Sequence, residues 1–204
     1  MTSAAGPAVG DGELDAEFAE TVRRTGASIG ALFLLEPGGG LLRLTLLCGA
    51  PAEFAAPWTH VSMTAPAPVA EAVREDRMVW VGSQEQMARS YPRTAMVLPF
   101  PLALVAAPVT GARRWGSLLL IWPASRPPYM TARERGNIAS SCGRLARLLD
   151  DADAHGRSPA VGGARPRAPP RGGPPRPPPP GGPARGPPPR APRPPRGRGA
   201  RGQA

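Results

Sequence analysis

The chain has no lysine, because all 25 of its basic side chains are arginine. A Walker-type phosphate loop, a pyridoxal phosphate enzyme and a protein kinase each need a lysine at a phosphate or cofactor, so these classes are excluded. Cysteine and histidine are scarce, with two of each. Cys48, Cys142, His60 and His155 follow no metal-binding or redox spacing. We therefore expect no metal site, no cofactor and no disulfide.

A long apolar run is also missing. The most apolar stretch, Ala95–Val109, is shorter than a bilayer requires and is interrupted by three prolines. The N-terminus carries acidic rather than basic residues, unlike a secretion signal. With two distant cysteines, these features predict a cytoplasmic protein without a membrane partner.

Acidic residues are absent after Asp153. Residues 156–204 hold 17 of the 30 prolines, 11 of the 25 glycines and 11 of the 25 arginines. Residues 1–155 keep the other 14 arginines against all 15 acidic residues, so their net charge is −1 and the excess positive charge belongs to the tail. Such a tail cannot bury enough apolar surface to fold. We predict a flexible segment at 1–12, one folded domain at 13–155 and a disordered, polyproline-like tail at 156–204.

Three hypotheses for the tail stay open. It is a spacer toward a further module, or a weak and non-specific binder of RNA or DNA through its arginines, without aromatic side chains to stack on bases. Alternatively it has no selected function and is a frameshifted or degenerate remnant. Arginine, proline, glycine and alanine are the residues that GC-rich codons encode, which is why the third hypothesis stands beside the others.

Hydrophobic periodicity divides residues 13–155 into helices and strands. Pro37-Gly38-Gly39-Gly40 separates two apolar runs and is typical of a hairpin turn, while Ser83 and Thr131 each open a capping box. Residues 50–63 are expected to form a loop with short helical turns. The predicted elements are a helix at 11–25, strands at 28–36 and 41–49, a helix at 68–76, a strand at 78–82, a helix at 83–90, strands at 102–109 and 115–123, and a helix at 131–154.

This order predicts an α+β domain. Hairpin-linked strands flanked by helices indicate one antiparallel sheet of about five to six strands, with helices on one face and loops on the other. The last helix carries a stripe spaced by four, three and four residues, formed by Ile138, Cys142, Leu145 and Leu149. Both a helix packed on its own sheet and a coiled-coil seam have such a stripe. We expect the first half to pack internally and the second half to be available to a second subunit.

Ser28 lies in a G-x-S-x-G pattern, Gly26 to Gly30, that is also found around the nucleophile of serine hydrolases. In those enzymes the serine follows a strand and precedes a helix, whereas here a helix precedes it and a strand follows. The pattern therefore does not indicate a catalytic serine, and no catalytic residue is predicted. The glycine triplet Gly38–Gly40 lies between strands, without the helix N-terminus that a phosphate loop requires, so it is interpreted as a turn.

With the order of elements established, the chain resembles a GAF domain, in particular those that precede serine/threonine phosphatase domains of sporulation type in bacterial signalling proteins. The segments that carry the resemblance span roughly residues 13–153 and include GASIGALFLLEPGGGLLRLTLLCGAPAEFAAPW, PVAEAVREDRMVWVGS, YPRTAMVLPFPLALVAAPV, WGSLLLIWP and TARERGNIASSCGRLARLL. The resemblance implies a GAF/PAS-like sheet, a regulatory rather than enzymatic role, and dimerisation through the terminal helices.

The resemblance also implies a ligand cavity between the sheet and the loops. If it takes a small molecule, we expect Trp58, His60, Trp80 and Tyr91 to bound it. Three departures limit what carries over. The metal-binding acids of a phosphatase are absent after Asp153, the lysine-containing signature of cyclic-nucleotide-binding GAF domains cannot occur, and no segment matches the chromophore-attachment context of phytochromes.

Overall fold

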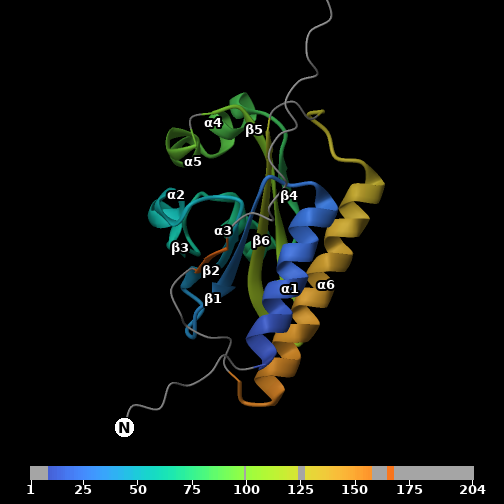
Figure 1. Ribbon diagram of the computed structural model, residues 1–204. Coiled ribbons are helices and arrows are strands. Elements are labelled where there is room, and N and C mark those ends of the chain that lie inside the picture. Colours follow the sequence, from blue (N-terminus) through green and yellow to red (C-terminus); the bar gives the residue numbers. More distant parts are fainter. Residues whose placement is uncertain (1–8, 99, 124–126, 158–164, 168–204) are drawn as a thin grey trace, which may run out of the picture. The chain divides into compact units, whose positions relative to one another are not determined.

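The computed structural model of the protein describes residues 9–98, 100–123, 127–157 and 165–167. Six strands form one antiparallel sheet in the order β3–β2–β1–β6–β5–β4 (Figure 1). Their bounds are β1 Ile29–Leu35, β2 Leu41–Cys48, β3 His60–Ser62, β4 Val79–Val81, β5 Leu102–Thr110 and β6 Arg114–Pro123. The first and last long strands, β1 and β6, are therefore neighbours at the centre of the sheet.

The sheet separates two hydrophobic cores. Because side chains alternate along a strand, β1 sends Ala31 and Phe33 to one face and Leu32 and Leu34 to the other. All four are buried. The continuous apolar runs of the sequence thus belong to strands that are covered on both sides.

Two long helices, α1 (Val9–Thr25) and α6 (Ala132–Ala154), lie side by side on one face of the sheet (Figure 1). The Nε atom of Arg144 and the Oε1 atom of Glu17 join them at 2.7 Å. Helix α1 rests on the backbone of β1 at Gly30, where a Cβ atom would overlap Val22 and crowd Phe18. The close seating requires glycine at that position.

The stripe of the last helix faces inward. Its four side chains are between 0 and 5% exposed and pack in the core between the helices and the sheet: Ile138, Cys142, Leu145 and Leu149. The expectation that the second half of this stripe is available to a second subunit is therefore corrected. The sheet and α1 together cover the whole length of the stripe.

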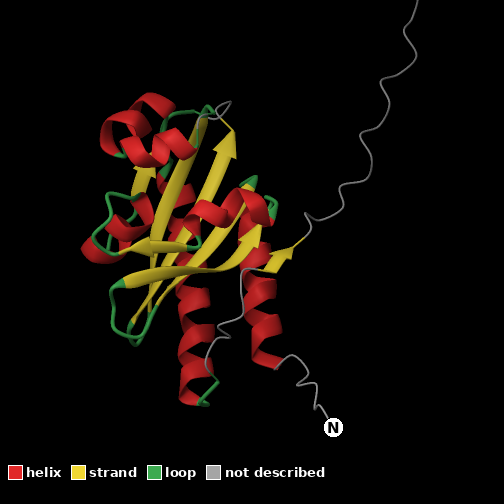
Figure 2. Cartoon of the chain, turned by 90° about the vertical axis from the view of Figure 1, so that its left-hand side faces the viewer, coloured by secondary structure: helices red, strands yellow, loops and turns green. Residues whose placement is uncertain are grey.

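Short helices cover the opposite face, which Figure 2 shows toward the viewer. They are α2 Ala52–Ala55, the 3-10 turn η1 Ala56–Trp58, α3 Pro68–Glu75, α4 Gln84–Ser90 and α5 Pro92–Val97. The helices predicted at 68–76 and 83–90 and the short helical turns predicted within 50–63 are present, but they cover the face for which loops were expected, and the sequence missed α5 and β3 altogether. A helix of four to six residues shows less than two turns of periodicity, so only its packing reveals it.

The capping boxes are only partly alike. At α6, the Thr131 hydroxyl accepts the Glu134 N–H and the Glu134 carboxylate accepts the Thr131 N–H, as predicted. At α4, Ser83 accepts the Gln86 N–H, but the Gln86 amide accepts from Gly82 instead. Both helices begin where the sequence indicated.

The remainder of the sequence lies largely outside the described residues. Arg165–Arg167 form β7, which pairs in parallel with Leu46–Cys48 of β2, on the part of that strand that β3 leaves unpaired. The prediction placed these three residues in a disordered tail. Residues 1–8 and 168–204, and the predictions made for them, lie outside what the structure describes.

Candidate ligand cavity

A cavity of about 40 Å³ lies between the sheet and the short helices. Strands β1, β2, β5 and β6 form its floor, with side chains such as Ala31 and Leu104. Its roof consists of α2, η1, the start of α3 and α5. Pockets that hold drug-sized ligands measure about 300–1,000 Å³. In this conformation the cavity has room for only a few atoms.

The lining is almost wholly apolar. Among the described residues that line the cavity, only Thr94 and the indole of Trp58 offer a polar side-chain group, and none is charged. Thr94 and Leu98 come from α5 and its end, and both are buried. An apolar lining of this kind offers water few of the polar partners that it needs.

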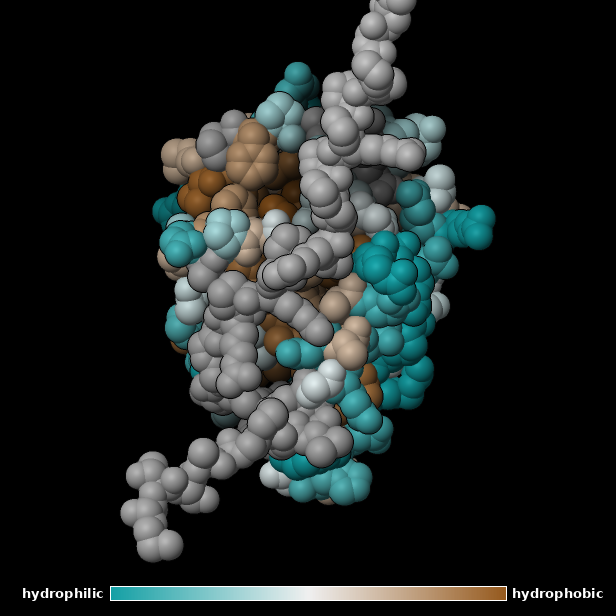
Figure 3. Space-filling view, in the orientation of Figure 1, coloured by the Kyte–Doolittle hydropathy of each residue, from teal (hydrophilic) through white to brown (hydrophobic). Residues whose placement is uncertain are grey.

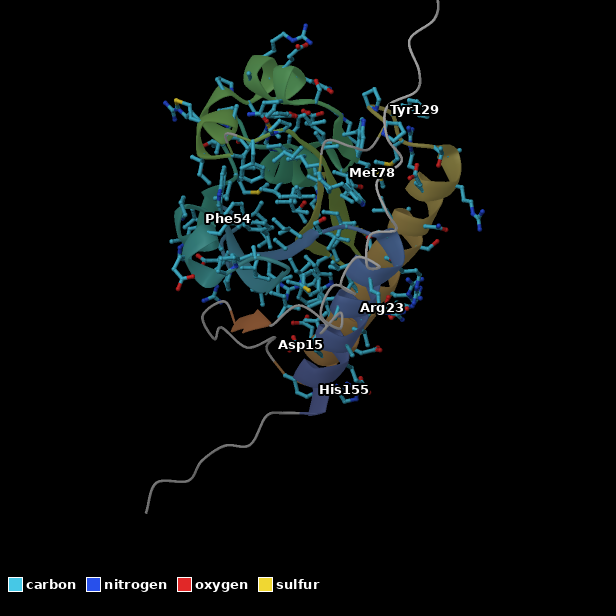
Figure 4. The ribbon with its side chains drawn as sticks, turned by 45° about the horizontal axis from the view of Figure 1, so that its top comes forward. Asp15, Arg23, Phe54, Met78, Tyr129 and His155 are labelled. Carbon is cyan, nitrogen blue, oxygen red and sulfur yellow. The ribbon has the colours of Figure 1, made fainter. Side chains whose placement is uncertain are left out.

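Hydrogen bonds from Gln84 and Tyr91 and one ring contact hold the roof. The Gln84 Nε2 atom donates to the carbonyl oxygen of Leu98 at 2.9 Å, which attaches the end of α5 to α4. Phe54 of α2 packs against Phe100, beyond α5, with ring centroids 6.1 Å apart. In Figure 4, Phe54 lies on the short-helix side of the sheet, across from α1. The remaining polar link starts from Tyr91.

Tyr91, between α4 and α5, donates its hydroxyl to the Oε2 atom of Glu71 at 2.7 Å, which fastens the roof to α3. Burial raises the pKa of this hydroxyl, and its hydrogen bond to the Glu71 carboxylate raises the pKa further. Glu71 also pairs with Arg77. The hydroxyl is therefore protonated at neutral pH and serves as a fixed donor.

The outer surface of the roof is apolar too. Met96 is 73% exposed, and Val97 and Phe100 are exposed as well. Figure 3 shows hydrophobic surface in the region of α2 and α5, whereas the surface along the long helices is mainly hydrophilic. Exposed apolar side chains thus lie next to the apolar cavity on this side of the domain.

The structure brings one of the four expected ligand residues to the cavity. Trp58 lines it. His60 is exposed on β3, with its Nε2 atom 3.7 Å from the Glu36 Oε1 atom. Trp80 lies on the opposite side of the sheet, where its ring packs against Trp122. Tyr91 is buried in the core of the cavity side, but it is not part of the lining.

Sequence reasoning missed the cavity residues of α5, above all Thr94 and Leu98. Proline favours the first position of a helix, and Pro92 follows a non-helical residue, so the position of Pro92 was the available signal for α5. Instead, the run that begins at Ala95 was interpreted only as an apolar stretch leading into a strand.

Ser28 and the glycine triplet have the positions that the sequence predicted. Ser28 is exposed between α1 and β1, and its backbone N–H donates to the Ile121 carbonyl oxygen of β6. Within the described residues no histidine hydrogen-bonds to its hydroxyl, and His155 lies at the far end of α6 (Figure 4). The glycine triplet connects β1 to β2.

In the described part of the chain, no group of three or more His, Cys, Asp or Glu side chains is arranged to hold a metal ion. Nor does any helix there combine the length and the apolar character needed to cross a bilayer.

Sequence comparisons identify no relatives. No protein-family model matches the chain, and no curated protein matches its sequence. Solved structures, in contrast, show clear similarity. The GAF domain of a phosphoenolpyruvate-protein phosphotransferase from Coxiella burnetii aligns with a TM-score of 0.59 at 12% identity, over 74% of this chain and 88% of that one.

Two further structures have the same architecture. A GAF domain/HD domain protein from Geobacter sulfurreducens aligns with a TM-score of 0.58 at 14% identity, over 73% of this chain and 97% of that one. A type II free methionine-R-sulfoxide reductase from Thermoplasma acidophilum aligns with a TM-score of 0.55 at 13% identity, over 70% and 93%. At these identities the similarity establishes the fold, and the fold is that of GAF domains.

Proposed function

We propose that this chain is a non-enzymatic regulatory module that senses a small molecule in the cavity under α2 and α5. The observation that carries the proposal is an apolar cavity beneath a roof of short helices, on one face of a GAF-type sheet. Concave apolar sites with few polar groups are the usual form of ligand sites. One of the similar structures is an enzyme, so the fold alone leaves the role open, and the apolar cavity without a charged lining residue supports the proposal of binding.

Native mass spectrometry of the full chain, purified from its own host, tests the proposal. We expect a species heavier than the chain by the mass of one small molecule. Ala31→Val adds two carbon atoms to the cavity floor, on a strand that favours branched residues, and should abolish this species. Ala139→Val, on the exposed face of α6, makes the same change outside the cavity and should retain it.

The proposal fails if neither wild type nor Ala139→Val carries added mass and no metabolite extract from the host raises the melting temperature of the wild type. A retained molecule that Ala31→Val leaves bound would instead place the ligand elsewhere on the domain. The first result would contradict ligand binding, and the second would contradict only the assignment of the ligand to this cavity.

Homodimerisation through the terminal helices belongs to the same proposal. Because the stripe from Ile138 to Leu149 is internal, the contact has to use the outer faces of α1 and α6. The subunit number follows from the same mass spectra, and a monomer at micromolar concentration would contradict a stable dimer.

The enzyme that such a module would control is proposed from the sequence resemblance described above. A serine/threonine phosphatase is the candidate, because the resemblance is to modules that precede such domains. Co-purification of a phosphatase with the full chain from its host would support this assignment. Recovery of a kinase or a nuclease in its place would contradict it.

The second candidate function is polyanion binding through the arginine-rich tail. Eleven of the 25 arginines and no acidic residue follow residue 155, which favours a salt-sensitive contact with RNA or DNA. Deletion of residues 156–204 separates the two candidates. Loss of all nucleic-acid binding with the cavity ligand retained would assign the two activities to different parts of the chain.

A further inference from the structure

The cavity lining restricts the chemistry of the ligand, and this inference rests on the proposed function. We infer that the cavity takes a compact, neutral and largely apolar molecule, and that it rejects carboxylate- and phosphate-bearing ligands. Strands β1, β2, β5 and β6 contribute only aliphatic and aromatic side chains to the floor. An ion transferred to such a surface loses its hydration without gaining a partner.

The first turn of α3 is the one feature that points toward an anion. Helix N-termini bind phosphate and carboxylate groups through free backbone N–H groups, and Ala67, Pro68 and Val69 border the cavity. Pro68, at the first helical position, has no N–H to offer. The Glu71 N–H is already bonded to the Ala67 carbonyl oxygen. Ala67 has no side chain to cap the Val69 and Ala70 N–H groups, so these two are the donors that an acidic ligand would use, against the cost of losing its hydration on an otherwise apolar lining.

Two basic side chains close to α3 have other partners. Arg77 pairs with Glu71 and Glu75 on the outside of α3, and Arg74 donates to the carbonyl oxygens of Met63 and Ala65. Arg74 and Arg77 are exposed. Among the described residues of the lining there is no counter-ion for an acidic ligand.

The polar groups that do line the cavity suit a single neutral function on the ligand. Thr94 carries a hydroxyl, which both donates and accepts, and Trp58 carries an indole N–H, which donates, although polar atoms make up almost none of the cavity surface. An alcohol, a ketone or a small heteroaromatic ring needs no more than one or two such partners. The remaining surface of the ligand would contact Phe54, Leu104 and their apolar neighbours.

The volume of the cavity and the position of its roof limit the size of the ligand. A cavity of about 40 Å³ admits a molecule of several heavy atoms only when the roof moves outward. The short helices α2 and α5 carry much of the roof side of the lining, so they are the part that has to move for a larger molecule to enter. Binding should therefore perturb Leu98 on the roof as well as Leu104 and Leu119 on the floor.

Matched pairs of probes test the charge requirement. The full chain, labelled with ¹³C at leucine and valine methyl groups, is titrated at pH 7.5 with 1-hexanol and with hexanoate, which differ only in the charged end. Indole and indole-3-acetate form a second pair, and adenosine monophosphate represents phosphate ligands. We expect each neutral member to shift the methyl signals of Leu98, Leu104 and Leu119, with an affinity at least tenfold higher than that of its acid.

Ala31→Val should weaken binding of the neutral probes by at least tenfold, and Ala139→Val should leave it unchanged. Hexanoate or the phosphate ligand binding at these methyl groups as tightly as the alcohol would overturn the apolar class while the cavity stays a ligand site. If no probe shifts the three leucines, the inference is overturned. The retained mass in the host-purified protein, and its loss in Ala31→Val, then decides separately whether the proposed function survives.

Discussion

The indole Nε1 atom of Trp115 donates a 2.6 Å hydrogen bond to the carboxylate of Asp150. The same carboxylate accepts the backbone N–H of Ala112, in the turn between β5 and β6. Arg113 of that turn covers the Trp115 ring at 3.9 Å and pairs with Asp153. One turn of α6 thus fixes the end of the longest hairpin in the described part of the sheet.

Replacing Asp150 should therefore destabilise the domain. Asp150→Ala leaves a buried indole N–H and a backbone N–H without their acceptor, which should lower the free energy of unfolding by about 2 kcal/mol. Asp150→Asn keeps one acceptor oxygen and should cost less. Urea denaturation followed by tryptophan fluorescence measures both. Asp151→Asn, on the exposed side of the same turn, is the matched control, and an equal loss in the control would show that the effect is general to helix charge.

Gly116 and Gly136 should respond to alanine in opposite directions. At Gly116, with φ at 153°, a Cβ atom would overlap the carbonyl oxygen of Phe33 on β1, so Gly116→Ala should cost at least about 2 kcal/mol. Gly136 is exposed in the second turn of α6 with open space around it, so Gly136→Ala should stabilise the domain by about 0.5–1 kcal/mol. Melting temperatures of the two variants give the signs, and a shift in the same direction would contradict this account.

The thiol of Cys142 should make stability fall at alkaline pH. Burial raises the pKa of Cys142 to about 12, against a usual value of 9.0. The folded state holds the thiol proton more tightly than the unfolded state does. The contribution of this thiol to the free energy of unfolding is therefore complete below pH 9 and is lost as the pH rises from about 9 to about 12. At pH 10 we expect a loss of about 1 kcal/mol relative to pH 8.

Urea titrations of the wild type and of Cys142→Ala at the two pH values isolate this effect. The variant should lose less stability between pH 8 and pH 10, since tyrosines and other groups titrate equally in both proteins. A difference of zero between the two proteins would mean that the thiolate is tolerated in the core.

Ser28 should not react with a fluorophosphonate probe. It lies between a helix and a strand, in the reverse of the order that exposes a hydrolase nucleophile, and within the described residues no imidazole bonds to it. In-gel fluorescence of the labelled full chain provides the measurement. Labelling that Ser28→Ala removes would restore the hydrolase hypothesis.

The fold was largely accessible from the sequence because its main elements are periodic. The helix predicted at 11–25 is confirmed as α1, with Leu14, Phe18 and Val22 on its buried side, and the hairpin predicted from the glycine triplet is confirmed as well. The interior direction of the last stripe was predicted only in part. A spacing of four, three and four residues is the same for an internal helix and a coiled coil, and only the position of α1 beside α6 distinguishes them.

The site was less accessible. Aromatic side chains near loops suggested Trp58, His60, Trp80 and Tyr91, but the face of the sheet to which each side chain points depends on strand register. Trp80, between the buried Val79 and Val81, faces the long helices for this reason. The apolar residues that line the floor are indistinguishable in the sequence from ordinary core residues. Their role appears only when a gap is left between the two layers.

The contact at Gly30 has a mechanical consequence for α1. Val22 sits in a notch whose bottom is bare backbone, and the next residue of β1 on that face is Leu32, with a full side chain. Any slide of the helix along the strand would drive Val22 out of the notch and into a neighbour. The notch therefore sets the longitudinal register of α1 on the sheet, and with it the height at which Glu17 meets Arg144 of α6.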